Sequence, residues 1–209
     1  MNMSLSFAPR EEDDILDTTI LDSETGSVMY TVGTPKHAEG ALTTTVTRRS
    51  QVDGSARFAF KIVWKGVRNS LKDVMVVLDS RTLEEVPVRE VLKNAPGGST
   101  YGSVRIDDVE YRWKTKGTGS KVVLVNKVTG ETVAQSHSRI RSSFFRKPRD
   151  MSLEISEAIS HAVDVVLLTF ILVWRERQTG KLEGMHTYHD LAVKDTMTPL
   201  PIGDGWRIG

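Results

Sequence analysis

The clearest chemical pattern in this sequence is a basic segment between residues 139 and 149 that also contains aromatic side chains. It holds no acidic residue, and its basic and aromatic members are Arg139, Arg141, Phe144, Phe145, Arg146, Lys147 and Arg149. Each Lys or Arg close to an anionic membrane leaflet adds about 1 kcal/mol of binding free energy, and Phe side chains enter the membrane interface. The segment therefore has two interpretations: a site for an anionic lipid head group such as a phosphoinositide, or a solvated basic edge whose Phe residues cover one end of the domain.

Other residues capable of chemistry lack the spacing that a reaction or a metal needs. Residues 117–121 read Gly-Thr-Gly-Ser-Lys, but a phosphate-binding loop has four residues between its glycines and a helix after them, whereas a strand is expected here. His186, His189 and Asp190 lie in a segment with no predicted helix, so nothing fixes the geometry of a metal site. We therefore predict no catalytic residue, no metal site and no cofactor.

The composition excludes several classes of protein. The chain has 209 residues, 28 Lys and Arg against 27 Asp and Glu, and no Cys, which rules out disulfides, thiolate metal sites and cysteine nucleophiles. A net charge of +1 disfavours a general nucleic-acid binder. The first twenty residues contain no basic region followed by an apolar one, so we expect a cytoplasmic protein, located at the periphery of a membrane if the 139–149 segment binds lipid.

Most of the chain has the patterns of β-strands. Val, Thr and Ile, which favour strands, number 24, 20 and 10. Apolar and basic residues alternate between residues 57 and 65. Between 110 and 115, Tyr111, Trp113 and Thr115 alternate with charged residues, and the turn at Asp107 and Asp108 before them predicts a hairpin. Two loops, 22–26 and 126–130, share the pattern Asx, two residues, Thr-Gly, which predicts two further hairpins.

Two helices are predicted. A short one begins at Pro87 and ends before Pro96, and a long one covers 157–178, with Ser156 as its N-cap and Gly180 just beyond its end. Between residues 162 and 174 the long helix has only two polar members and no polar stripe, so protein or lipid must enclose it. These thirteen residues cover about 20 Å, less than a hydrocarbon core of about 30 Å, which favours enclosure by the protein.

The polar members of this helix are Asp164 and Thr169. Asp164 needs a partner, and His161, three residues earlier, is the local candidate. We expect this to be a satisfied polar pair at the mouth of the fold and not a catalytic pair.

Several of these motifs also support a family resemblance. The residues that carry it are the Leu-Asp-Ser-Glu-Thr-Gly loop, the Tyr111–Lys114 strand, the Arg146–Arg149 run before Ser152–Ile155, and the apolar helix. Over residues 5–178 they resemble a domain of unknown function found in mushroom-forming (basidiomycete) fungi, and more distantly the tubby C-terminal-like superfamily, which includes the LURP-one-related proteins and phospholipid scramblases.

The resemblance implies an α+β, mainly β fold: a curved antiparallel barrel of about ten to twelve strands around a central hydrophobic C-terminal helix. We expect this domain to cover 1–178, and 179–209 to form a loosely ordered tail in which Trp206 docks on the domain or on a partner. The predicted function is a non-enzymatic intracellular binding module for anionic lipid or a protein partner. The alternative is a scramblase-like or membrane-inserted protein that uses the 157–178 helix.

Overall fold

The structure is a computed structural model that describes residues 2–9, 14–35, 42–65, 74–78, 81–93, 100–116, 121–139 and 150–194, with 179–194 described as backbone only. Its strands are β1 (Met3–Pro9), β2 (Thr18–Asp22), β3 (Val28–Gly33), β4 (Leu42–Arg49), β5 (Ala56–Trp64), β6 (Val74–Val77), β7 (Val86–Pro87), β8 (Thr100–Ile106), β9 (Val109–Lys116), β10 (Lys121–Asn126), β11 (Thr132–His137) and β12 (Met151–Ile155). Its helices are α1 (Val88–Val91), the 3₁₀ helix η2 (Glu157–Ala162) and α2 (Val163–Lys194). Residues 1–176 form one compact unit and 177–209 a second.

The twelve strands form one antiparallel sheet, ordered β7-β6-β5-β4-β3-β2-β1-β12-β11-β10-β9-β8. Neighbours in the sheet are neighbours in the chain except where β1 pairs with β12, for example Leu5 with Leu153, and so joins the two halves. The sheet has two edge strands, β7 and β8, so the closed barrel implied by the resemblance is not confirmed. The mainly β architecture with twelve strands and a C-terminal helix is confirmed.

The predicted hairpins are present, and their turns use the expected chemistry. The Asp22 carboxylate accepts the backbone N–H groups of Glu24 and Thr25, and Gly26 follows at φ +69°. Asn126 and Gly130, at φ +74°, repeat the arrangement. A third loop, 50–55, has the same backbone hydrogen bonds, with Gly54 at φ +67°. The sequence pattern did not identify it, because Ser50 stands in place of the Asx residue and Asp53 in place of the Thr.

The β8–β9 hairpin is also confirmed, with a turn tighter than the sequence alone specified. Asp107 and Asp108 have φ of 47° and 63°, as in a type I′ turn. In β9 Tyr111 and Trp113 are buried while Arg112 and Lys114 are exposed, as the alternation predicts. In β5 the apolar Phe60, Ile62 and Trp64 are buried.

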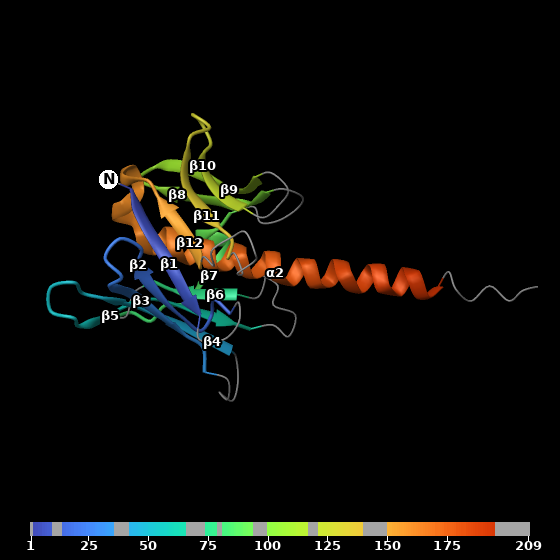
Figure 1. Ribbon diagram of the computed structural model, residues 1–209, viewed down its shortest axis with the longest axis horizontal. Helices are drawn as coiled ribbons and strands as arrows, with labels where there is room; N and C mark the ends of the chain where they lie inside the picture. The colour runs from blue at the N-terminus through green and yellow to red at the C-terminus, as the bar shows by residue number, and fades with distance from the viewer. Residues whose placement is uncertain are drawn as a thin grey trace, which may run out of the picture. The chain divides into compact units, whose positions relative to one another are not determined.

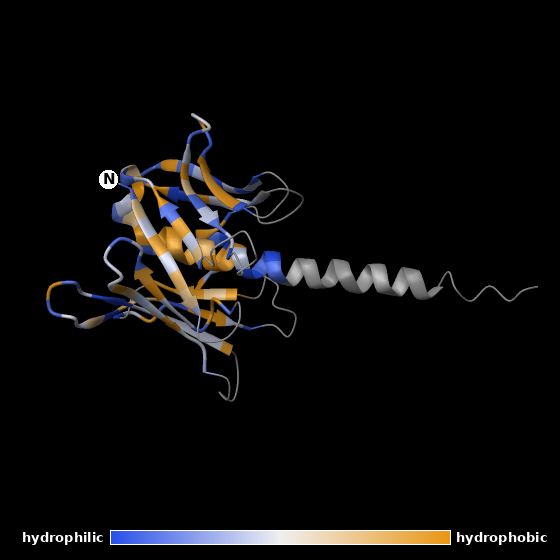
Figure 2. Ribbon diagram, in the orientation of Figure 1, coloured by the Kyte–Doolittle hydropathy of each residue, from blue (hydrophilic) through white to orange (hydrophobic). Residues whose placement is uncertain are grey.

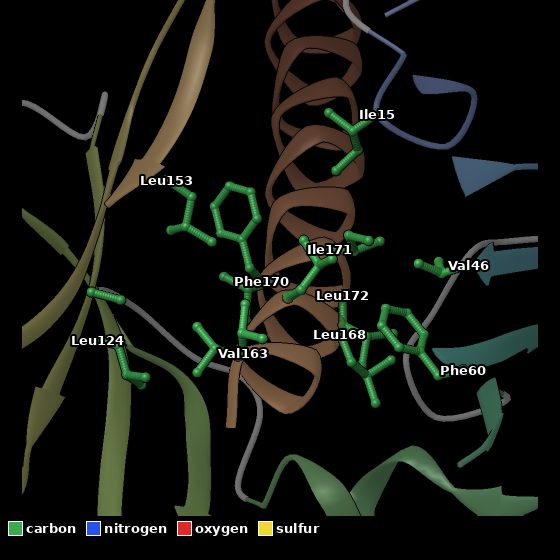
Figure 3. Close-up of a cluster of buried hydrophobic side chains, with 14 of the residues drawn as sticks. Ile15, Val46, Phe60, Leu124, Leu153, Val163, Leu168, Phe170, Ile171 and Leu172 are labelled. Carbon is green, nitrogen blue, oxygen red and sulfur yellow. The ribbon is translucent and has the colours of Figure 1, made fainter. Parts of the chain in front are cut away.

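The apolar part of α2 lies inside the first unit and fills the space between the two halves of the sheet (Figure 1). Every residue from Val166 to Val173 has no exposed surface. Figure 3 shows Leu124 and Leu153 on one side of the helix and Val46 and Phe60 on the other, and Figure 2 shows that this stretch of α2 is its hydrophobic part. Enclosure of the predicted helix by the protein is therefore confirmed for residues 166–173.

The ends of the predicted helices differ from the structure. The long helix begins with the 3₁₀ turn η2, and Ser156 precedes it without a side-chain capping bond. Helical backbone then continues to Lys194, so Gly180 lies within α2 and not just beyond its end. In the short helix Pro87 is the N-cap and not the first helical residue, and α1 is only four residues long.

Gly102 allows Leu92 and Lys93, the two residues after α1, to pack against β8. Its φ is +120°, and a Cβ there would lie 3.0 Å from Leu92 Cγ and 3.1 Å from the Lys93 carbonyl oxygen. Leu92 is buried, and Lys93 forms an isolated antiparallel bridge with Ser103. The close approach therefore depends on the absence of a side chain at residue 102.

We predict that Gly102→Ala lowers the free energy of unfolding by about 2–4 kcal/mol, because it combines left-handed backbone strain with a steric clash. Gly33→Ala is the matched control, because a Cβ at that position has no neighbour within 4 Å and its φ is not positive. Urea unfolding followed by circular dichroism measures both. Equal stability of the two variants would contradict the proposed packing.

Candidate functional site

Most of the predicted lipid-binding segment lies outside the described residues. This applies to Arg141, Phe144, Phe145, Arg146, Lys147 and Arg149. Arg139 is described; it is exposed, and its Nε lies 3.9 Å from a carboxylate oxygen of Asp150. The side chains of His186, His189 and Asp190 and all of Trp206 are also outside the described part, within which no group of three or more His, Asp or Glu is placed to hold a metal ion.

The described residues contain a cluster of basic side chains on the outer surface of β9 and β10. Arg112, Lys114 and Lys116 point outward from β9, because the residues between them, such as Trp113, point into the core. Lys121 on β10 is directly opposite Lys116 in the register. We call these four residues, Arg112, Lys114, Lys116 and Lys121, the basic face.

Within the described part of the chain, the four residues of the basic face have no ion-pair partner. The nearest acid on β9, Glu110, pairs with Lys127 at 2.7 Å, and the hydrogen bond from that lysine lowers the pKa of Glu110. Like charges directly opposite each other on neighbouring strands destabilise a sheet, as Lys116 and Lys121 do here. A bound anion would relieve this repulsion.

Two buried valines lie beside Arg112 and Lys114 on the outer side of the sheet. The register places Val123 opposite Lys114 and Val125 opposite Arg112, and both valines are buried although they do not belong to the central core. Long basic side chains commonly cover apolar surface with their methylene stems and keep the charged group in water. The face therefore presents cations at fixed positions on a paired sheet.

The polar groups at the start of α2 have different partners from those predicted. The Tyr30 hydroxyl donates a hydrogen bond to Asp164 Oδ1 at 2.5 Å, and Arg48 Nη1 lies 3.6 Å from Asp164 Oδ2. His161 instead contacts Asp107 in the β8–β9 turn, at 2.5 Å. The predicted His161–Asp164 pair is therefore wrong: each residue ties the start of the helix to a different half of the sheet.

The burial of Tyr30 and its raised pKa indicate that the Tyr30–Asp164 pair has a structural role. Tyr30 is fully buried, and burial together with the hydrogen bond to Asp164 raises the pKa of its hydroxyl well above the usual value. A phenol with a raised pKa is a poor nucleophile and a poor acid. Further along the helix, Trp113 Nε1 donates to Thr169 Oγ1 at 3.0 Å, which satisfies the other polar group of the helix.

A polar groove of about 420 Å³ lies on the outer side of β11 and β12, beside Asn2. Its lining includes the carboxylates of Glu131 and Glu154, and Glu154 is 3.1 Å from His137 Nε2. This groove has the opposite charge to the basic face, so the two surfaces do not form one site.

A comparison with protein families gives a match over most of the chain. The model of a family of unknown function, DUF6593, matches residues 13–179. The chain belongs to this family. Members of DUF6593 have no function assigned through it, and no curated protein matches the chain.

One solved structure, a protein from Arabidopsis thaliana described as AT5G01750, is similar to this DUF6593 chain. The two share 14% sequence identity over 81% of this chain and 89% of that one, with a TM-score of 0.38. At that score the similarity carries no argument about the function.

The sequence analysis placed part of the basic face on the solvent side of a strand but did not identify it as a candidate binding site. The alternation in β9 identified Arg112 and Lys114 as a solvent-facing side of a strand. The position of Lys121 opposite Lys116 depends on the β9–β10 register, which no local pattern specifies. Counting charges along the chain would have been a signal, because residues 112–149 contain ten Lys and Arg and one acid, Glu131.

We predict that Tyr30→Phe destabilises the protein by about 1–2 kcal/mol near neutral pH, through loss of a hydrogen bond to a charged group. Because the pKa of Tyr30 is higher in the folded state than in the unfolded state, its contribution is complete below pH 10 and is lost as pH rises further. Above pH 10 the difference between the two proteins should therefore shrink by about 1.4 kcal/mol per pH unit. Urea unfolding between pH 8 and 11 tests this, and a constant difference would contradict it.

Proposed function

We propose that this protein is a non-enzymatic binding module that attaches to an anionic membrane surface through the basic face and the adjoining 139–149 segment. The observation that carries the proposal is a group of four cations without ion-pair partners among the described residues, of which three are exposed and Lys121 is half-buried. Each cation near an anionic leaflet contributes about 1 kcal/mol, so four contribute about 4 kcal/mol before the 139–149 segment is counted. Such binding weakens as salt concentration rises.

The strand topology supports the proposal that the basic face and the 139–149 segment belong to one binding surface. In the antiparallel sheet β9 ends at Lys116, β10 begins at Lys121 and β11 ends at His137, all at the same end of the sheet. The chain leaves β11 there and continues through Arg139 into the 139–149 segment. Under this proposal the Lys116 and Lys121 end of the sheet faces the lipid, and Phe144 and Phe145 enter the interface.

The anionic leaflet of a cell membrane faces the cytoplasm, so the proposal places the protein in the cytoplasm, peripherally bound. We also propose that the open sheet around an enclosed helix belongs to the tubby C-terminal-like superfamily. The motifs named above and the enclosure of α2 support that relation.

Insertion of α2 into a membrane is the second candidate. Glu157–Gln178 is long and apolar enough to cross a bilayer by length and composition, although core helices of soluble proteins pass the same test. Insertion would require the sheet to release side chains that are fully buried between Val166 and Val173. Carbonate extraction separates the candidates, because it releases a peripheral protein and leaves an inserted one in the membrane.

Co-sedimentation with liposomes tests the first candidate. We expect the wild-type chain to sediment with phosphatidylcholine vesicles that contain phosphatidylserine or a phosphoinositide, and not with phosphatidylcholine alone. Lys114→Glu with Lys116→Glu should weaken binding by at least about 30-fold, because two favourable terms of about 1 kcal/mol are lost. Arg146→Ala with Lys147→Ala should weaken it through the 139–149 segment.

The matched control is Arg57→Glu with Lys61→Glu, which changes the net charge equally on β5, outside the basic face. Both double variants change the net charge by the same amount. Apart from the effect of that net charge, the β5 variant should bind vesicles within about twofold of wild type. Equal losses in the β9 and β5 variants would show that only net charge matters. Equal sedimentation with neutral and anionic vesicles would reject the proposal.

A further inference from the structure

Across the seam between the two edge strands, β7 and β8, the described residues form one β-bridge, fewer pairs than in any ladder of the sheet. These strands share no ladder. The chain that follows β7 reaches β8 through a single bridge, in which Lys93 and Ser103 exchange two backbone hydrogen bonds of 2.8 and 2.7 Å. Among the described residues, two backbone hydrogen bonds therefore join the two edges, whereas every pair of neighbouring strands in the sheet shares at least two residue pairs.

The segment that fills the seam is short. α1 has a single turn without a side-chain capping bond at its start, far below the length at which a helix is stable alone. Its position depends on Val88 and Leu92, which are buried in the central core, and on the contact between Leu92 and Gly102. Few side chains must therefore leave the core for this segment to detach.

The same core cluster contains the apolar side chains of α2 between Val163 and Val173. We propose that the sheet opens at this seam: Leu92 and Lys93 detach from β8, α1 leaves the core with them, and part of the apolar helix is uncovered, while the strand ladders remain intact. The free energy of this opening is limited to the contacts of one short segment, whereas exposing α2 elsewhere requires separation of a paired ladder. The inference is independent of lipid binding by the basic face.

Native-state hydrogen exchange tests the opening in the full chain. The amide hydrogens of Leu92, Lys93 and Ser103 are bonded across or beside the seam, and those of α2 between Val166 and Val173 report global unfolding. We expect the three seam amides to exchange roughly a hundredfold faster than the α2 amides, with a weaker dependence on denaturant. Exchange of both groups at the same rate and with the same denaturant dependence would overturn the inference.

A disulfide across the seam supplies a second measurement. The chain has no Cys, so Lys93→Cys with Ser103→Cys introduces one defined pair. Partners that exchange both backbone hydrogen bonds have Cα atoms about 5.5 Å apart, within the range that a disulfide spans. Oxidation should slow exchange of the Leu92 amide by about tenfold or more relative to the reduced form of the same variant.

The control pair is Ser6→Cys with Ser152→Cys, which are partners in the β1–β12 ladder. Its oxidation should leave exchange of the Leu92 amide unchanged. The inference fails if the seam disulfide has no effect on Leu92, or if the control disulfide slows Leu92 as much as the seam disulfide does.

Discussion

The structure depends on the exclusion of water from every side of one helical segment. From Val166 to Val173 every residue of α2 is fully buried, and each fully buried Leu, Ile or Phe side chain contributes about 1.5–3 kcal/mol relative to exposure. A flat sheet covers one side of a helix, so strands must lie on several sides of this one, as Figure 3 shows. The β1–β12 pairing meets that need, because it joins the N-terminal strands to the strands that precede α2. The sheet also satisfies two polar side chains of the helix, Thr169 within this segment through Trp113 and the half-buried Asp164 just before it through Tyr30, and these bonds fix the rotation of the helix.

Because α2 fills the interior, the proposed function places binding on the outer surface. The helix occupies the space in which many β-proteins hold a ligand, so the outward-facing side chains of the strands become the candidates for binding. Their charges are segregated: the chain as a whole is nearly neutral, but residues 112–149 are strongly basic and the remainder is net acidic. The basic face arises because the inward positions of β9 are required for the core, with Trp113 fully buried, and the outward positions are free to carry Arg and Lys.

Local patterns predicted the parts of this fold that local chemistry determines. Alternation identified β5 and β9, Asx and Gly residues identified two turns, and the missing polar stripe identified the enclosed helix. Interactions between distant parts of the chain were not predictable in this way. Asp164 pairs with Tyr30, 134 residues away, and Lys121 meets Lys116 through strand register. The closed barrel was inferred by resemblance, and the structure has a seam instead. Of the predicted binding segment, the structure describes Arg139. Identification of the basic face required the strand register as well as the sequence.

The enclosure of α2 by the sheet is tested most directly by nuclear Overhauser contacts in the full chain in water. The structure predicts cross-peaks between the indole N–H of Trp113 and the methyl group of Thr169, whose side chains are hydrogen bonded at 3.0 Å. It also predicts cross-peaks between the rings of Phe7 and Phe170, whose centroids are 5.6 Å apart. Absence of both sets of contacts, together with broadening of the Phe170 and Thr169 resonances by a soluble paramagnetic probe, would contradict the account.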